Sequence, residues 1–240
     1  MKMNPMLSSR ENLVKSTLVI IPCFNESTVL KEVICELISK GFDIVVVDDC
    51  SNDDSAEILK YFSIHYIKHP INLGQGAALT TGFQYAQSLP HPYVVTFDAD
   101  GQHNPNDIIN LLDTLANNDY DIVFGSRFLN GTHKMPKMRK LVLKFGIIVN
   151  YLFTGILLSD AHNGLRAFKR TQLQSLNFSE NRMAHATELL FIAKKYTMKY
   201  AECPTNTRYT DYSLKKGQRN ISSINLFFDI FLFKLFRNAD

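Results

Sequence analysis

Short hydrophobic runs alternate with longer amphipathic segments through the first half of the chain. The runs are rich in β-branched residues, as buried strands are, and fall at 18–21, 44–47, 64–67, 93–97 and 121–124. Helical spacing of apolar residues separates them at 28–40, 55–62, 75–88 and 106–117. Apolar strands separated by helices predict an α/β fold with a mostly parallel central sheet and helices on both faces.

Polar clusters follow four of the predicted strands. They fall at 22–26, 48–53, 98–102 and 126–127. Because right-handed crossovers place the carboxyl ends of parallel strands at one edge of the sheet, we expect these clusters to meet in one crevice, where open α/β sheets bind ligands. Turn chemistry explains each cluster alone, but not all four together.

The most informative cluster holds Asp98 and Asp100, directly before a helix that Asn104 and Pro105 are expected to open. Two carboxylates this close repel each other unless a cation lies between them. Mg²⁺ or Mn²⁺, held by carboxylates and substrate phosphates, meets that need. A solvated Asp-rich turn has the same spacing, so the pair indicates a metal only together with the other clusters.

Composition narrows the possible functions. With 240 residues, 45% of them hydrophobic, the chain can bury one substantial core. Its net charge of +3 is too small to indicate binding to nucleic acid, and we expect no nucleic-acid partner. The four cysteines lack the spacing of a zinc site or a disulfide framework, which is typical of a cytoplasmic protein. Residues 1–15 lack the apolar segment of a signal peptide.

Gly74 and Gly76 lie where the helix 75–88 is expected to begin. Glycines at a helix start let the backbone approach a flat or anionic ligand closely. The spacing matches neither the dinucleotide-binding motif nor a P-loop. Alone, this pair is read as a turn.

Six segments carry a family resemblance in their order along the chain. They are Val-Ile-Ile-Pro-Cys-Phe-Asn-Glu at 19–26, Val-Val-Asp-Asp-Cys-Ser-Asn-Asp at 46–53, Asp-Ala-Asp at 98–100, Gly-Ser-Arg-Phe at 125–128, Asp-Ala-His-Asn-Gly-Leu-Arg-Ala-Phe at 160–168, and Glu188. Together they resemble family-two glycosyltransferases, in the branch of dolichol-phosphate mannose synthases and polyprenyl-phosphate sugar transferases. The resemblance covers 17–212 and implies the GT-A nucleotide-diphospho-sugar transferase fold, inversion at the anomeric carbon and a divalent metal.

The resemblance also implies roles for individual residues. Those expected to hold the donor nucleotide are Pro22, Asn25, Glu26, Asp49 and Asp98. Those expected to bind the metal are Asp98, Asp100 and Gln102. Arg127, Arg166 and Arg208 are candidates for phosphate contacts, since guanidinium groups bind phosphate oxygens through paired hydrogen bonds. A surface ion pair is the alternative for each arginine, and it suits Arg166 better than Arg127, which directly follows a predicted core strand.

One departure from the branch concerns the acceptor. A segment that usually reads like Thr-Gly-Ser-Phe-Arg is His-Asn-Gly-Leu-Arg at 162–166. A phosphate acceptor needs positioning by basic groups, whereas a sugar hydroxyl needs a general base. The candidate bases are Asp160, His162, His185 and Glu188, with Asp160 preferred; an alternative role for Glu188 is to anchor an active-site arginine.

The chain divides into an N-terminal extension (1–16), a catalytic domain (17–212) and a basic loop with a C-terminal amphipathic helix (213–240). The stretch 208–219 suits a loop that closes over a diphosphate, and equally a solvated linker. Polar residues interrupt the apolar segments 138–158 and 221–236, so neither suits a membrane-spanning helix. We expect both to lie at the inner face of the cytoplasmic membrane; packing onto the catalytic domain and a homodimer contact are the alternatives.

Three functions follow. The leading hypothesis is a metal-dependent, inverting transfer of a sugar from a nucleotide-diphosphate sugar to a polyprenyl phosphate. The second keeps this chemistry but uses a sugar hydroxyl of a lipid-linked or cell-surface glycan. The third, a nucleotidyltransferase, normally needs a Gly-rich basic loop after the first strand, which 22–26 lacks.

Overall fold

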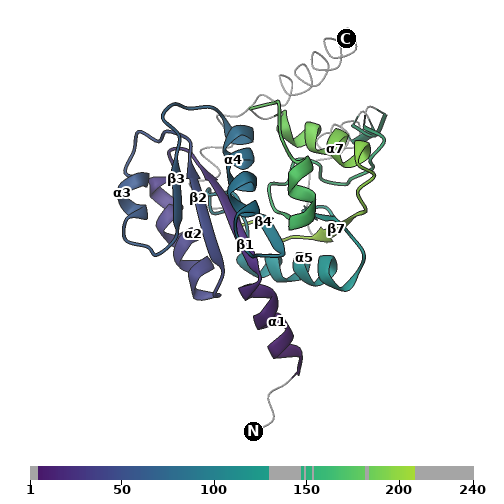
Figure 1. Cartoon of the computed structure of the whole chain (residues 1–240), viewed down its shortest axis with the longest axis horizontal. Helices are drawn as coiled ribbons and strands as arrows, with labels where there is room; N and C mark the ends of the chain where they lie inside the picture. The colour runs from purple at the N-terminus through teal and green to yellow at the C-terminus, as the bar shows by residue number, and fades with distance from the viewer. Residues whose placement is uncertain (1–4, 130–146, 149, 153, 182–183, 209–240) are drawn as a thin grey trace.

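The computed structural model describes residues 5–129, 147–148, 150–152, 154–181 and 184–208 (Figure 1). This part of the chain forms a seven-stranded sheet in the order β3-β2-β1-β4-β6-β5-β7. The strands are β1 (Thr17–Cys23), β2 (Asp43–Asp48), β3 (His65–Lys68), β4 (Tyr93–Thr96), β5 (Ile122–Ser126), β6 (Arg166–Lys169) and β7 (Tyr200–Pro204). The helices are α1 (Pro5–Lys15), α2 (Ser27–Ser39), α3 (Ser55–Leu59), α4 (Gln75–Gln87), α5 (Pro105–Asn117), α7 (His185–Lys195) and the 3-10 helix η1 (Arg170–Ser175).

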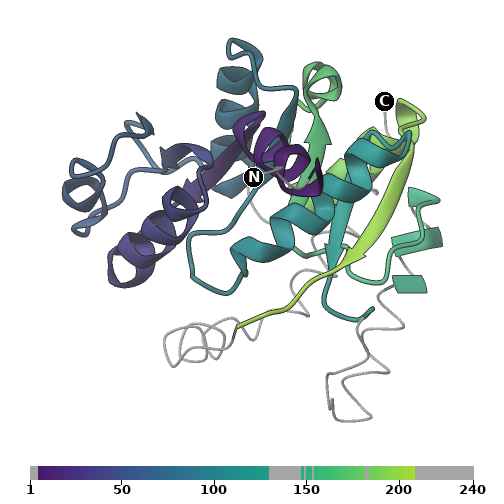
Figure 2. The same ribbon diagram turned by 90° about the horizontal axis from the view of Figure 1, so that it is seen from below.

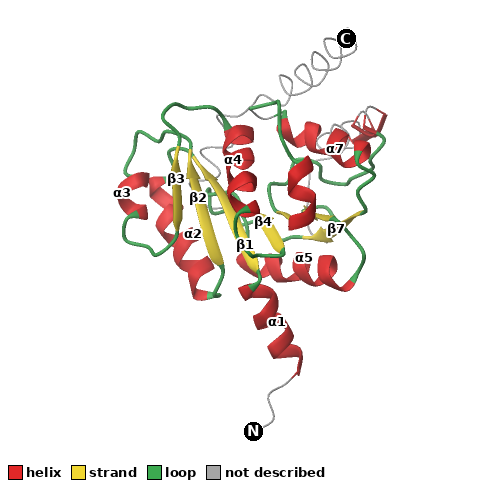
Figure 3. Cartoon of the chain, viewed as in Figure 1, coloured by secondary structure: helices red, strands yellow, loops and turns green. Residues whose placement is uncertain are grey.

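The sheet is mostly parallel. β1 pairs in parallel with β2 and β4, as β2 does with β3 and β5 with β7. β6 runs antiparallel between β4 and β5 and was not predicted from the sequence. The five predicted strands and four predicted helices are all present, with helices around the sheet (Figure 3). The predicted fold class is therefore confirmed.

Both faces of the sheet are buried, as β1 shows. Val19 and Ile21 face one apolar cluster, which includes α2 and α5, whereas Leu18 and Ile20 face the other, which includes α4 and α7. All four side chains are fully buried, and each such burial contributes about 1.5–3 kcal/mol to folding. Because successive side chains of a strand point to opposite faces, two buried faces produce the continuous apolar runs of the sequence.

The loop between β4 and α5 carries the acidic pair, and its far end is fixed by a helix cap. Asn104 Oδ1 accepts a hydrogen bond from Asn106 N at 3.1 Å, and Pro105 occupies the first turn of α5. Both predicted roles are confirmed. A capped start satisfies an otherwise unpaired N–H group and holds the loop against α5.

The N-terminal extension folds as α1, which lies beside α5 (Figure 2). Val14 is buried in the core, and Arg10 forms a 3.2 Å ion pair with Asp113 of α5. The predicted segments 213–240 and 221–236, and most of 138–158, lie outside the described residues. Within the described ranges, each helix is too short or too polar to traverse a bilayer.

Candidate active site

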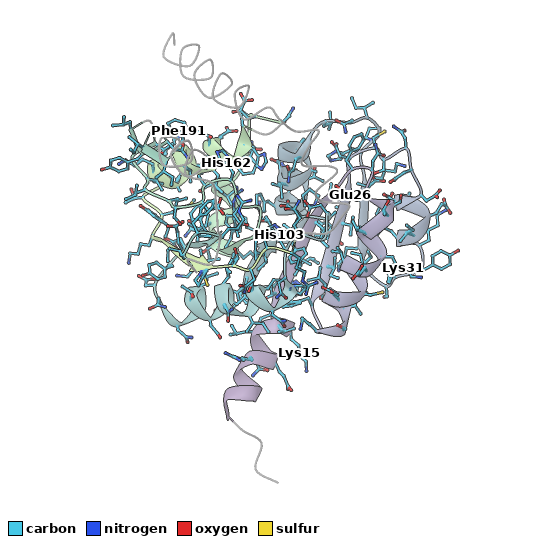
Figure 4. The ribbon with its side chains drawn as sticks, turned by 180° about the vertical axis from the view of Figure 1, so that it is seen from behind. Lys15, Glu26, Lys31, His103, His162 and Phe191 are labelled. Atoms are coloured by element: carbon cyan, nitrogen blue, oxygen red, sulfur yellow. The ribbon has the colours of Figure 1, made fainter. Side chains whose placement is uncertain are left out.

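A cavity of about 520 Å³ lies at the carboxyl ends of β1, β2 and β4. The predicted residues in its wall are Pro22, Glu26, Asp49, Asp98, Asp100, His162, Arg166 and His185. They come from the loops after three parallel strands, from β6 and the loop before it, and from the start of α7, so polar clusters converge here as the sequence predicts. Glu26, His103 and His162 mark three of the loops around this edge (Figure 4).

A second cavity, of about 160 Å³, adjoins the first. Its wall includes Gln102, His103, Arg127 and Thr207. The residues that line both cavities are Asp98, Asp100, His162 and Gly164. Groups bound in the two cavities would therefore meet at the acidic pair.

The Asp98 carboxylate is held from two sides. Gln75 Nε2 donates to its Oδ1 at 3.0 Å, and His103 Nε2 lies 2.9 Å from its Oδ2. Burial alone would raise the pKa of Asp98, but the hydrogen bond and charge of His103, with the charges of Arg166 and His185, lower it below the ordinary value. Asp98 is therefore ionised and oriented before any ligand binds.

Gly164 packs directly against the same carboxylate. A Cβ atom at this position would lie 2.0 Å from Asp98 Oδ2, far inside van der Waals contact. Thr96 Oγ1 donates to Gly164 O at 2.7 Å and fixes the backbone there. Glycine is therefore required for steric reasons rather than for an unusual backbone conformation.

The negative charge of Asp100, close to that of Asp98, is the reason to expect a bound cation. Burial raises its pKa above the ordinary value, and the charge of Asp98 adds to this effect. Among the described residues no cluster of three His, Cys, Asp or Glu side chains surrounds a metal position. The two carboxylates with the amide oxygen of Gln102 nevertheless form a hard oxygen donor set, to which substrate phosphates would add ligands. This set fits Mg²⁺ or Mn²⁺.

Affinity for Mn²⁺ should fall as the pH is lowered below neutral, because Asp100 must lose its proton to bind a metal and its pKa is raised. Titration calorimetry with MnCl₂ measures this affinity. His103→Gln is the control, since it removes the imidazole that contacts Asp98, and the variant should keep the trend. A pH-independent affinity would contradict the role of Asp100.

Asn25 and Glu26 were both predicted to hold the nucleotide, but they occupy different positions relative to the larger cavity. Asn25 has φ +56° and ties two loops together: its N donates to Ser51 Oγ at 3.0 Å, and its Oδ1 accepts from Asn52 N at 2.9 Å. Glu26 is buried and lines the larger cavity. Asn25 thus holds together two of the loops that border the site. Its contact with nucleotide stays a prediction.

Arg127 and Asp160 form a bidentate pair. The Nε and Nη2 atoms of Arg127 donate to the Asp160 carboxylate at 2.7 and 2.8 Å, and Arg127 N donates to it at 3.1 Å. Asp160 lines neither of the two cavities, whereas Arg127 lines the smaller one. The geometry gives Asp160 the task of orienting Arg127; its role as a general base stays a prediction.

Arg166 is buried, so the surface ion pair suggested for it is wrong. Its Nη2 donates to Ala161 O at 3.3 Å, and its Nε has no partner among the described residues. Loss of water lowers the pKa of Arg166 to about 10, against the charges of Asp98 and Asp160. The guanidinium remains protonated at neutral pH and presents an unused donor beside the larger cavity.

Arg208 lines neither of the two cavities. It donates to both carboxylate oxygens of Glu36 on α2, at 2.7 and 2.8 Å, and to Asn104 Oδ1 at 3.2 Å. Its backbone N donates to Gln102 O at 2.8 Å. Arg208 therefore ties the end of the described chain to the acidic loop, and a phosphate contact would require its side chain to turn.

Two residues that contact the acidic pair were not identified from the sequence. Gln75 follows a glycine that was read as a turn, and only the tertiary fold brings its amide to Asp98. His103 directly follows the predicted metal ligands in the sequence. This position was the only feature of the sequence that could have indicated its contact with Asp98. Glu188 accepts hydrogen bonds from Ser179 N and Glu180 N at 3.0 and 2.8 Å, and no contact to an arginine is seen within the described residues.

Comparisons with known proteins agree with this geometry. Residues 18–176 match the family model described as Glycosyl transferase family 2. The UDP-N-acetylglucosamine–dolichyl-phosphate N-acetylglucosaminyltransferase of Methanococcus voltae is 32% identical over 92% of this chain and 97% of that protein. The undecaprenyl-phosphate 4-deoxy-4-formamido-L-arabinose transferase of Salmonella choleraesuis is 28% identical over 90% of this chain and 67% of that protein.

Among solved structures, the glucosyl-3-phosphoglycerate synthase of M. tuberculosis superposes with a TM-score of 0.67 at 17% identity, over 87% of this chain and 79% of that chain. Other structures of that synthase contain Mn²⁺ or Mg²⁺ with UDP. This likeness shows the GT-A fold. The chain therefore belongs to glycosyl transferase family 2, as an enzyme similar to the polyprenyl-phosphate sugar transferases.

Proposed function

We propose that this enzyme transfers a sugar from a nucleotide-diphosphate sugar to a polyprenyl phosphate, with inversion and with Mg²⁺ or Mn²⁺. One observation carries the proposal: the acidic pair forms the wall between a large cavity and a smaller one that contains Arg127. The larger cavity has room for the donor, and the smaller one offers a guanidinium to an anion. The names of the relatives support this acceptor class.

The proposed reaction needs no proton transfer. A phosphate oxygen of the acceptor attacks C1 of the sugar opposite the diphosphate; the bond from C1 to the diphosphate oxygen breaks, and the nucleoside diphosphate leaves with the electron pair. A divalent ion bound by Asp98, Asp100 and Gln102 would neutralise the leaving diphosphate. Arg127, held by Asp160, positions the acceptor anion, and Arg166 adds positive charge beside the donor.

A sugar hydroxyl as acceptor is the second candidate, and His162 favours it. This residue lines both cavities. Loss of water lowers its pKa, and the positive charge of Arg166 adds to this effect, while the charge of Asp160 opposes it. The imidazole is therefore neutral at neutral pH and able to accept a proton.

Arg127→Gln should distinguish the two acceptors. Because the variant loses the charge that holds an acceptor phosphate, kcat/KM with polyprenyl phosphate should fall about a hundredfold, mainly through KM. Binding of nucleoside diphosphate with Mn²⁺ should be unchanged. Arg10→Gln, at an exposed pair far from the cavities, is the control. Transfer to glycan hydroxyls alone, or full activity of Arg127→Gln, would contradict the proposal.

We also propose that the enzyme works at the inner face of the cytoplasmic membrane, where a polyprenyl acceptor is presented. Ile148, Leu152 and Leu157, from the segment 138–158, expose large apolar side chains, and Leu152 is 72% exposed. Such side chains support contact with the bilayer interface. For the predicted C-terminal helix at 221–236, a homodimer contact is the alternative to contact with the membrane.

A further inference from the structure

We infer that Glu202 is a positioning residue for sugar transfer, one that holds Arg127 in place through the segment 159–160. This inference rests on the function proposed above and deepens its acceptor side. Glu202 lies on β7, opposite Phe124 of β5. It lines neither of the two cavities, so any effect on the acceptor has to pass through other side chains.

Glu202 fixes the backbone on which Asp160 is carried. Its Oε1 accepts hydrogen bonds from Ser159 N at 2.8 Å, from Ser159 Oγ at 2.7 Å and, at a longer 3.3 Å, from Asp160 N. Two backbone N–H groups and one hydroxyl thus converge on a single carboxylate oxygen. The Asp160 side chain therefore starts from a backbone that is tied to β7.

A chain of hydroxyl groups extends this contact to the end of β5. Ser126 Oγ and Ser159 Oγ lie 2.6 Å apart. Because the only hydroxyl proton of Ser159 is donated to the carboxylate, Ser126 has to be the donor to Ser159. Ser126 Oγ in turn accepts from Phe128 N at 3.2 Å. Glu202 can only accept, so it sets the direction of every hydrogen bond in this chain.

Arg127 is contacted by both ends of this arrangement. Asp160 holds its guanidinium through the bidentate pair, and the Phe128 ring centroid lies 5.6 Å from its Cζ, within the range of a cation–π contact. The Asp160 side chain is 3% exposed, whereas that of Arg127 is 32% exposed and reaches the smaller cavity. A long side chain presents its charge in one position only with such support, and a misplacement of about 1 Å can cost about a hundredfold in rate.

A second anchor keeps the segment attached where Glu202 is altered. Asn163 Nδ2 donates to Thr205 Oγ1 at 3.1 Å, and Thr205 N donates to Ser126 O at 2.9 Å. Loss of the Glu202 contacts should therefore let Asp160 shift locally without detaching residues 159–163 from the end of β7. The position of Arg127 can thus be changed without unfolding the protein.

Two substitutions separate the reach of Glu202 from its charge. Glu202→Asp keeps the charge but is one CH₂ group too short to reach Ser159 and Asp160, so the KM for polyprenyl phosphate should rise about tenfold with kcat within about twofold. Glu202→Gln can place its amide oxygen at the position of Oε1, which receives all three hydrogen bonds, and should keep this KM within about threefold of the wild type. Affinity for Mn²⁺, measured by titration calorimetry, should be unchanged in both variants.

Asp121→Ala is the matched structural control. Asp121 precedes β5, at the opposite end of the same strand pair, and accepts from Lys199 N and from Gln172 Nε2, both at 2.9 Å. Its loss should lower the temperature of thermal unfolding and leave the KM for polyprenyl phosphate unchanged. A general loss of stability is thereby distinguished from a displaced Arg127.

A double-mutant cycle tests whether Glu202 acts through Arg127. In an Arg127→Gln background, Glu202→Asp should raise the KM no further, whereas independent effects would multiply. Ser159→Ala removes the hydroxyl link alone, should raise the KM about threefold, and decides the question if circular dichroism shows Glu202→Asp unfolded.

Three results would overturn the inference while leaving the proposed function standing. They are an unchanged KM in the folded Glu202→Asp or, where that variant is unfolded, in Ser159→Ala; an equal loss in Glu202→Gln and Glu202→Asp; and a tenfold effect that persists in Arg127→Gln. If Arg127→Gln alone keeps the wild-type KM, the proposed function fails and the inference fails with it.

Discussion

Asp100→Asn should lower kcat/KM for sugar transfer about a thousandfold and at the same time raise the temperature of thermal unfolding. The catalytic loss follows because an amide cannot provide the charge that holds a divalent ion against the donor diphosphate. The hydrogen bond from Gln102 N at 3.0 Å can persist on the Asn oxygen, so the loop should keep its shape.

The gain in stability has a separate cause. Burial and the charge of Asp98 raise the pKa of Asp100, which means that folding disfavours its ionised form. The unfolded chain carries the same charge at neutral pH without that cost. A neutral Asn removes the penalty, so the free energy of unfolding at neutral pH should increase.

Asp119→Asn is the matched control for this experiment. Asp119 is exposed and pairs with Lys169 and Lys199 at a distance from both cavities. Its removal should leave transfer and Mn²⁺ binding unchanged. Activity and Mn²⁺ affinity in Asp100→Asn equal to those of the wild type would refute the metal assignment.

Gly164→Ala should lower kcat/KM about a hundredfold with little change in stability. The new methyl group would lie 2.0 Å from Asp98 Oδ2, so the carboxylate has to move away from its contacts with Gln75 and His103. Gly164 is not one of the residues with positive φ, so alanine is allowed by the backbone. Mn²⁺ affinity should fall together with activity.

Gly41→Ala should show the opposite result and serves as the control. Gly41 has φ +85°, but a Cβ there would meet only Val14 Cγ1, at an ordinary 3.6 Å. The substitution should therefore cost about 1 kcal/mol of stability and leave transfer unchanged. If Gly164→Ala instead lost stability and kept its activity, the glycine would serve packing rather than the position of Asp98.

The parts of the fold that local sequence determines were predicted correctly. Runs such as 44–47 identify buried strands because both faces of the sheet are covered, and the rule for parallel strands then gathers Asp49, Asp98 and Arg127 at one edge. The roles of Gln75 and Arg208 could not be predicted in this way. Each depends on which distant side chain lies nearby, Asp98 in one case and Glu36 in the other, and such pairing leaves no local pattern.

β6 was missed for a related reason, since its few apolar residues directly follow a polar motif. Its antiparallel course places Arg166 opposite Thr96, two residues before the acidic pair. Side chains of a strand alternate between the two faces of the sheet. Inserting one amino acid just before β6 would therefore turn the Arg166 guanidinium toward the face covered by α2 and α5. An alanine or leucine side chain would then take its place beside the larger cavity. Insertions or deletions between β5 and β6 are therefore tolerable only where they leave the position of residue 164 and the register of β6 unchanged. Chimeras built from segments of related transferases must keep to this constraint.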